Sequence, residues 1–135
     1  MHSVAKRAYL AGFLDGEGHI GLHRRNKADS VHCVHVSLAN TNLTVLLEIQ
    51  VLWGGYLQTK STLPLQKVGY DLRWNGGKST TNLLKELLPY LRVKREQAKI
   101  ALEYNGTLSS HYSGRAGVPS EIQTCRKVLV VQMHK

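Results

Sequence analysis

The chain has 135 residues, with 18 Lys and Arg against 9 Asp and Glu, which gives a formal net charge of +9. This length predicts one domain, residues 1–135, built around a single core. The excess positive charge favours a polyanionic partner such as nucleic acid. No apolar run approaches the roughly 20 residues of a membrane span, and Cys33 and Cys125 match no zinc or disulfide pattern, so we expect a soluble, intracellular protein without a membrane partner.

The hydrophobic pattern predicts helices alternating with pairs of strands. A helix over 4–14 precedes strands over 18–25 and 31–39, joined by a turn at 26–30. A helix over 43–52, ending at a Gly-Gly pair, precedes strands over 56–60 and 67–74. Further helices are expected from a cap at Ser79 or Thr80 to Pro89, over 94–104, and over 120–133 after a loop at 105–117. This order predicts an α+β fold, a four-stranded antiparallel sheet with helices on one face.

The polar members of each alternating strand should form the sheet face that the helices leave open. In the fourth strand the same alternation predicts that Val68, Tyr70, Leu72 and Trp74 face the core. The outward set is His19, His23, Arg25, His35, Ser37, Tyr56, Gln58, Lys60, Lys67, Asp71 and Arg73.

A polar outer face is common to many antiparallel sheets, but this one carries the residue types that bind base edges. Arg and Lys suit guanine, Gln suits adenine and Asp71 suits cytosine, so the set is predicted to contact double-stranded DNA. Metal binding by His23 or His35 is the less favoured interpretation. Strand alternation places these residues on a sheet face, where no carboxylate is fixed beside either of them.

The segment 10–18, Leu-Ala-Gly-Phe-Leu-Asp-Gly-Glu-Gly, joins a helix of small residues to a glycine-rich acidic turn. Ala8, Gly12 and Gly16 recur every four residues, so they lie on one helical face that a second helix can approach closely. Asp15 and Glu17 fall at the negative end of the helix dipole, which favours a cation beside them, with a metal ion as the candidate. A helix ending at a hydrated turn is the alternative.

This segment resembles the LAGLIDADG signature of homing endonucleases, with identity at Leu10, Ala11, Gly12, Asp15 and Gly18. The resemblance implies the sheet fold predicted above. Because one motif is present, it also implies a homodimer whose opening helices pack together through Ala8, Ala11, Gly12 and Gly16. It further implies a divalent metal bound by the Glu17 carboxylate and the Gly16 carbonyl. Mg²⁺ is the expected ion, with Mn²⁺ able to substitute and Ca²⁺ bound without cleavage.

The same resemblance assigns two more catalytic candidates. The run from Pro89 to Lys94 is similar to a family segment that places a basic residue beside the scissile phosphate, which selects Lys94. The alternative interpretation of Lys94 is a solvated lysine in a basic cluster that aids phosphate binding. Asn40 falls near the family position for a polar residue that orients solvent.

The activity implied is site-specific cleavage of both strands of a long, roughly palindromic DNA target by an intron-encoded enzyme. One rival function is an RNA-binding maturase that assists splicing of its own intron. A second rival is a DNA-binding regulator on the same fold that does not cleave. Loss of the metal-binding acid would mark that regulator class, whereas Glu17 is present here.

Overall fold

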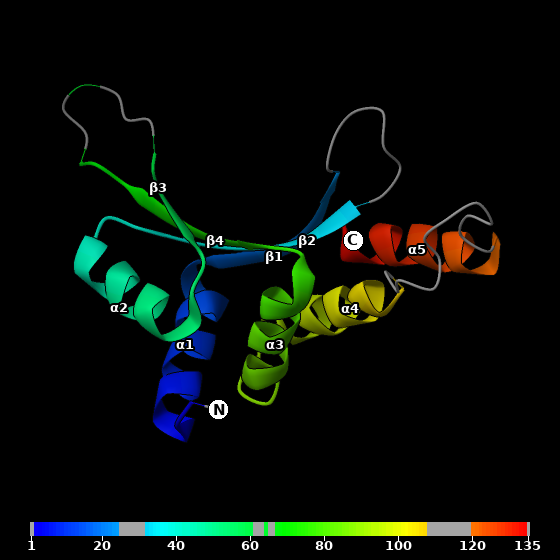
Figure 1. Ribbon diagram of the computed structural model, residues 1–135, viewed down its shortest axis with the longest axis horizontal. Coiled ribbons are helices and arrows are strands. Elements are labelled where there is room, and N and C mark those ends of the chain that lie inside the picture. The colour runs from blue at the N-terminus through cyan, green and yellow to red at the C-terminus, as the bar shows by residue number, and fades with distance from the viewer. Residues whose placement is uncertain (1, 25–31, 61–63, 65–66, 108–119, 135) are drawn as a thin grey trace.

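The computed structural model describes residues 2–24, 32–60, 64, 67–107 and 120–134, so Arg25 and the predicted turn at 26–30 lie outside the described residues. The elements, labelled in Figure 1, are α1 (Val4–Glu17), β1 (Gly18–Arg24), β2 (His32–Asn40), α2 (Leu43–Trp53), β3 (Tyr56–Thr59), β4 (Tyr70–Asn75), α3 (Gly77–Leu87), α4 (Arg95–Gly106) and α5 (Ser120–Met133). None of the described helices has the length and apolarity needed to cross a membrane.

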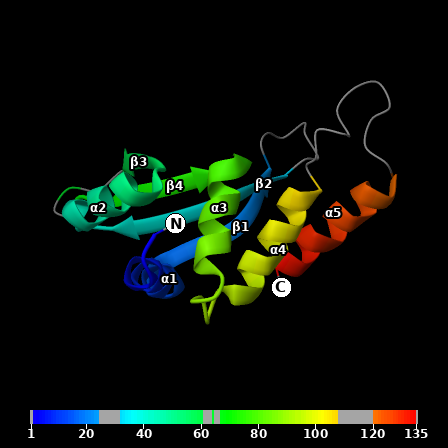
Figure 2. The ribbon, with the colours of Figure 1, turned by 60° about the horizontal axis from the view of Figure 1, so that its bottom comes forward.

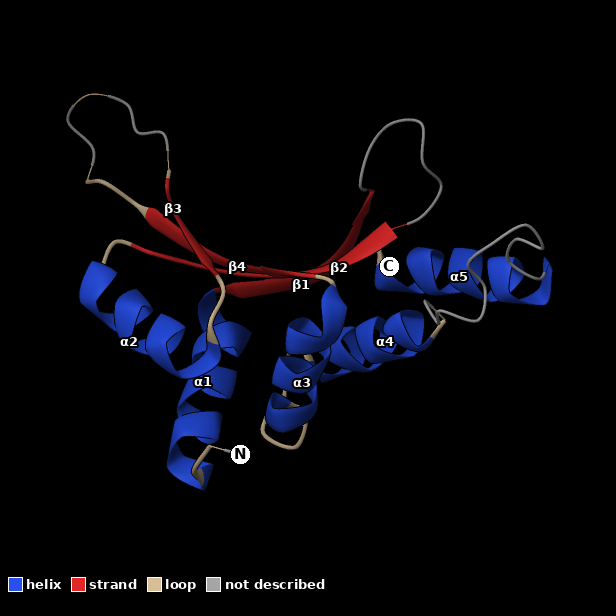
Figure 3. Ribbon diagram, viewed as in Figure 1, coloured by secondary structure: helices blue, strands red, loops and turns tan. Residues whose placement is uncertain are grey.

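The four strands form one antiparallel sheet in the order β1-β2-β4-β3, which confirms the predicted α+β fold. The two hairpins meet at the central pair β2 and β4. Figure 3 shows the sheet as one layer and the helices as a second layer beneath it. The strands rise at both ends in Figure 1, so the sheet face turned away from the helices is concave.

Apolar strand residues face the helices because alternate side chains of a strand point to the same side. Val36 lies between Ile20 of β1 and Trp74 of β4, and all three are buried. Helices α1, α3 and α4 contribute the other side of this core. Figure 2 shows α3 running across the sheet, with α4 and α5 packed side by side next to it.

Ala11 belongs to this core, with 0% of its surface exposed. Its predicted place in a contact between two α1 helices is therefore wrong. Each residue turns a helix by about 100°, so Ala11 points inward while Ala8, Gly12 and Gly16 on another side of α1 are exposed.

Several predicted boundaries also differ from the structure, and α4 for example continues to Gly106, two residues into the predicted loop at 105–117. Helix α1 continues to Glu17, where the Gly18 amide donates to the Leu14 carbonyl and closes the last turn. Helix α3 begins at Gly77, before the predicted caps, because Gly76 and Gly77 turn the chain with φ of 53° and 73°. Strand β4 begins only at Tyr70, so Lys67 lies before it and Val68, predicted to be buried, is 45% exposed.

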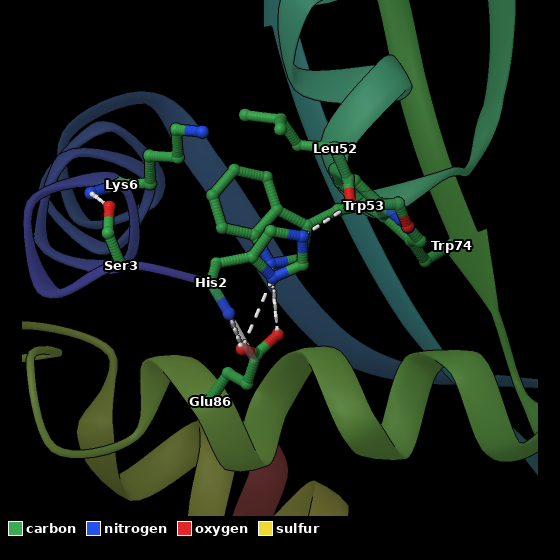
Figure 4. Close-up of polar contacts among 7 residues, drawn as sticks. All are labelled: His2, Ser3, Lys6, Leu52, Trp53, Trp74 and Glu86. Atoms are coloured by element: carbon green, nitrogen blue, oxygen red, sulfur yellow. Dashed lines mark hydrogen bonds and ion pairs between the residues drawn. The ribbon is translucent and has the colours of Figure 1, made fainter.

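The N-terminal end of α1 is fastened to α2 and α3 by His2, as Figure 4 shows. The His2 backbone amide donates to Glu86 Oε1 at 2.9 Å, and Nδ1 lies 2.9 Å from Glu86 Oε2. Nε2 lies 2.6 Å from the Leu52 carbonyl, and the ring stacks on Trp53 with centroids 4.3 Å apart. Both ring nitrogens thus lie within hydrogen-bond distance of oxygen atoms, one on α3 and one on α2.

Burial alone would raise the pKa of the Glu86 carboxyl, but hydrogen bonds from His2 and Trp53 lower it overall. A lowered pKa in the folded state stabilises the protein above the unfolded-state pKa, and that contribution is lost as the pH falls through the folded-state value. We expect Glu86→Gln to reduce the free energy of unfolding by about 2 kcal/mol at pH 7. The difference from wild type should shrink as the pH falls below the unfolded-state pKa and through the lower folded-state value.

Urea unfolding at several pH values measures this effect, with Glu121→Gln, which changes an exposed acid on α5, as the control. A Glu86→Gln deficit that stays constant as the pH falls through both pKa values would contradict the assignment to the ionised carboxylate.

Candidate active site and nucleic-acid interface

Glu17 is the last residue of α1, and its exposed side chain lies where the helix passes into β1. Asn40, the last residue of β2, donates from Nδ2 to Glu17 Oε2 at 2.7 Å. The Asn40 Oδ1 atom accepts from the Asn42 amide at 2.8 Å, which fixes the orientation of the Asn40 side chain. The structure therefore brings together two of the predicted catalytic residues, and Asn40 holds one oxygen of the Glu17 carboxylate.

Asp15 has a different role from the cation-facing acid that the sequence suggested. Its Oδ2 accepts from the Arg92 amide at 2.8 Å, and its Oδ1 accepts from the Lys94 amide at 2.9 Å. Both carboxylate oxygens are thus bound to the backbone just before α4. Glu17 is the acid that remains exposed at this end of α1.

Lys94 lies at the same helix end. It is half-buried at the N-cap of α4, and its Nζ donates to the Asp15 backbone carbonyl at 2.7 Å. A cation is stabilised there by the negative end of the α1 dipole and by the carbonyls that the last turn leaves unbonded. A cation was predicted beside the end of α1, and the ammonium of Lys94 occupies that place.

The donors at the end of α1 fit a hard divalent cation. The Glu17 carboxylate and the backbone carbonyl of the exposed Gly16 are oxygen donors of the kind that Mg²⁺ prefers. Mg²⁺ is commonly held by one or two carboxylates, with water and substrate phosphate completing the octahedron. The chemistry of these residues is therefore compatible with the predicted metal.

Several predicted interface residues form one row across the concave face. His19 pairs with Ser37, Ser37 pairs with Arg73, and Arg73 pairs with Tyr56, so the row crosses all four strands. The side chains in this row lie opposite to the buried Ile20, Val36 and Leu72, as strand alternation requires. Gln58 occupies the next row, paired with Asp71.

Asp71 is on the outward face but is only 6% exposed. Arg73 Nη2 lies 2.8 Å from its Oδ2, and Lys60 Nζ lies 3.9 Å from its Oδ1. The carboxylate thus holds two basic side chains, and its predicted contact with cytosine stays a prediction. Arg73 lies two residues further along the same strand, whereas Lys60 directly follows β3, so its contact with Asp71 depends on the pairing of β3 with β4, which local sequence does not specify.

Three histidines gather on the β1–β2 side of the concave face. Burial lowers the pKa of His19, and the nearby charges of His35, Lys94 and His134 lower it further. Burial and the neighbouring His35 and His19 lower the pKa of His23 in the same way. These two rings are therefore mainly neutral at pH 7, so they offer hydrogen bonds more than charge to a bound nucleic acid.

Asn75 is a residue of the concave face that the sequence pattern did not predict. It pairs with His35 between β2 and β4, and its Oδ1 lies 2.5 Å from His35 Nδ1. Asn75 is the last residue of β4, but in the sequence it directly precedes Gly76 and Gly77, where an asparagine ordinarily signals only a turn. Its position opposite His35 depends on the register between the two hairpins, which local sequence does not determine.

Comparison with known proteins agrees with this geometry. Residues 5–88 match the model of the LAGLIDADG-like domain. The chain belongs to the LAGLIDADG family. The matched region runs from α1 into the end of α3, so it includes Glu17 and Asn40 and stops before Lys94.

A relative and two solved structures extend the comparison. The chain is 34% identical over 108 residues to DNA endonuclease I-CvuI of Chlorella vulgaris, covering 76% of this chain and 65% of that protein's length. A crystal structure of I-CvuI with a DNA target is similar at a TM-score of 0.78 and 26% identity, over 96% of this chain and 80% of that one. The DNA complex of the archaeal intron-encoded homing endonuclease I-Vdi141I shares the fold, with a TM-score of 0.76 and 17% identity over 96% of this chain and 82% of that one.

The Asp15 contacts lead to a structural test. Asp15→Asn replaces one acceptor oxygen by an amide that cannot accept from Arg92 or Lys94, which should cost about 1–3 kcal/mol of unfolding free energy. Because Asn keeps one oxygen acceptor, we expect NMR to show faster hydrogen exchange at whichever of the Arg92 and Lys94 amides loses its acceptor. Glu17→Gln, two residues away, is the matched control and should leave both amides protected. Equal protection in Asp15→Asn and wild type would show that these bonds do not hold the segment.

Proposed function

We propose that this protein is a homodimeric, site-specific DNA endonuclease that hydrolyses both strands of its target with Mg²⁺ and is encoded in an intron. The observation that carries the proposal is the exposed Glu17 carboxylate, held by Asn40 at the end of α1 beside a concave, largely basic sheet face. The name of its relative I-CvuI, a DNA endonuclease, supports the reaction class. We further propose that the whole chain forms one domain. Its DNA target places its action inside the cell.

The chemistry needs a phosphodiester placed at the edge of the concave face, near the end of α1. Mg²⁺ bound to Glu17 would supply Lewis-acid activation of the phosphate and of the attacking water. Asn40 fixes the carboxylate by binding Oε2, so it acts on the acid as a positioning group. This placement differs from the solvent-orienting role that the resemblance implied for Asn40.

Lys94 is suited to stabilise the negative charge that develops on the phosphate. Its ammonium has three donors, and the bond to the Asp15 carbonyl uses one of them. The remaining donors can bind phosphate oxygens while the first keeps the side chain at the end of α1. An ammonium fixed before the reaction stabilises the transition state without further reorganisation.

The outward residues of the concave face are proposed to bind the duplex. Arg73 and Lys60, held by Asp71, supply fixed positive charge, while Tyr56, Gln58 and Ser37 supply hydrogen-bonding groups on the same face. The exposed Lys67 lies just before β4 and adds a further charge. A two-stranded ribbon fits the major groove, and each hairpin of the sheet provides one.

The homodimer is proposed from the exposed face of α1. A Cβ added at Gly12 or Gly16 would meet nothing within 4 Å, so this face is open in the single subunit. Val4 and Tyr9 on the same helix are 59% and 57% exposed, an unusual amount of apolar surface for one short helix. Packing two such helices together would bury this surface and bring the Glu17 residues of both subunits to the centre of the assembly.

Cleavage can be tested with DNA that carries the uninterrupted form of the host gene. We expect Glu17→Gln to reduce cleavage in Mg²⁺ by about 100-fold or more while DNA affinity in Ca²⁺ is kept. Glu48→Gln, which makes the same charge change at an exposed position of α2, is the matched control and should cleave normally. Normal cleavage by Glu17→Gln would remove this residue from the mechanism.

The same preparation distinguishes the rival functions. An endonuclease binds the duplex with an affinity that falls steeply as salt rises, because Lys and Arg displace counterions from phosphates. Tighter binding to the intron transcript than to the duplex, without cleavage, would favour the RNA-binding maturase. Tight duplex binding without cleavage in Mg²⁺ or Mn²⁺ would favour the regulator.

The dimer interface can be tested at Gly12. Within the subunit a leucine there has room and removes a helical glycine, which stabilises a helix by up to about 1 kcal/mol. We therefore expect Gly12→Leu to keep or raise the melting temperature of the subunit while weakening dimerisation at least tenfold in sedimentation experiments. Gly106→Leu, at an exposed helical glycine of α4 that is equally open, is the matched control. A dimer unaffected by Gly12→Leu would exclude this face of α1 as the contact.

A further inference from the structure

Three imidazole rings surround Gly21 on the concave face. His19 and His23 come from β1, and His35 is the residue of β2 that pairs with Gly21. The ring centroids of His23 and His35 are 4.6 Å apart, those of His19 and His23 are 5.6 Å apart, and those of His19 and His35 are 6.2 Å apart. This gathering is not needed to explain the Glu17 site.

The approach of His19 to His23 is unusual for a strand. Residues four apart on a strand are separated by about 13 Å along the backbone. The two Nε2 atoms are nevertheless 3.5 Å apart, so both rings lean toward each other over Gly21. A Cβ added at Gly21 would lie 2.7 Å from His19 Nε2 and 3.5 Å from His23 Nε2. The missing side chain of Gly21 thus creates the space in which the two nitrogens meet.

This spacing suits a shared cation better than a direct hydrogen bond. At 3.5 Å a nitrogen–nitrogen contact is long for a hydrogen bond. Two nitrogens bound at tetrahedral angles to one Zn²⁺, each at 2.0–2.1 Å, stand about 3.4 Å apart. An imidazole nitrogen binds metal through its lone pair, and the two Nε2 atoms approach each other in the space over Gly21.

We propose that His19 and His23 chelate a borderline divalent transition-metal ion, such as Zn²⁺ or Ni²⁺, through their Nε2 atoms. This imidazole site is distinct from the oxygen donors at Glu17, since Mg²⁺ prefers oxygen and Zn²⁺, Cu²⁺ and Ni²⁺ accept imidazole. Among the described residues no three His, Cys, Asp or Glu side chains already form a metal-binding group, so the chelate has two protein ligands and water completes the coordination.

His35 supports the chelate from the neighbouring strand. Its Nδ1 is held 2.5 Å from Asn75 Oδ1, and its ring packs beside that of His23. This contact limits the movement of the His23 ring and reduces the entropy lost when the metal binds. Lys94 contributes positive charge near His19, so affinity must come from coordination bonds and not from attraction by surrounding charge.

The test is a calorimetric titration of the untagged protein with Ni²⁺, in a buffer that does not coordinate metals and contains excess Mg²⁺. We expect one Ni²⁺ per chain and at least a tenfold loss of affinity in His23→Gln. Gly21→Ala should cause a similar loss, because the added Cβ displaces the His19 ring. Circular dichroism and melting curves show whether each variant has kept its fold.

Two matched variants make the result specific. His134→Gln changes a histidine that lies near the cluster and outside it, and Glu17→Gln changes the proposed Mg²⁺ ligand. Both should bind Ni²⁺ as wild type does. No Ni²⁺ binding by the wild type, unchanged binding in a folded His23→Gln, or an equal loss in either control would overturn the proposal. The titration measures no cleavage, so its outcome is independent of the nuclease proposal.

Discussion

The candidate site depends on the hydrogen bonds that the Asp15 carboxylate accepts. It binds the backbone amides of Arg92 and Lys94, far along the chain, and so joins the end of α1 to the beginning of α4. The Lys94 ammonium completes the connection by donating to the Asp15 carbonyl. Because charge-assisted hydrogen bonds are stronger than neutral ones, this junction fixes Lys94 relative to Glu17, which is only two residues after Asp15.

At the other end of α1, His2 makes a corresponding connection to α2 and α3 through the Leu52 carbonyl and Glu86. Helix α1 is thus fixed at both ends to the helical layer, while Leu10, Ala11 and Leu14 bury its middle against the core. The opposite side of α1, with Ala8, Gly12 and Gly16, is exposed among the residues that the structure describes. A helix fixed in this way can present a rigid surface to a second copy, with little conformational entropy to lose on binding.

Sequence patterns were sufficient for the sheet and for the motif, since strand alternation and the spacing of Ala8, Gly12 and Gly16 are local properties. They were insufficient wherever a side chain takes a partner distant in sequence. The amides before α4 that bind Asp15 and the Asn75 beside His35 depend on how separate elements pack, which local spacing does not specify. The errors at α3 and Val68 have another cause, because two left-handed glycines started the helix early and β4 paired later than its alternation suggested.

The two halves of the concave face, β3–β4 and β1–β2, carry different kinds of side chain. On the β3–β4 side, Asp71 holds the basic side chains of Arg73 and Lys60. On the β1–β2 side, the partly buried imidazoles of His19 and His23 are mainly neutral. A duplex lying across both sides would therefore meet fixed cations on one side and uncharged ring nitrogens on the other. A metal ion held between those ring nitrogens would add positive charge to the second side, so the proposed chelate would alter the charge of the nucleic-acid interface without changing the fold.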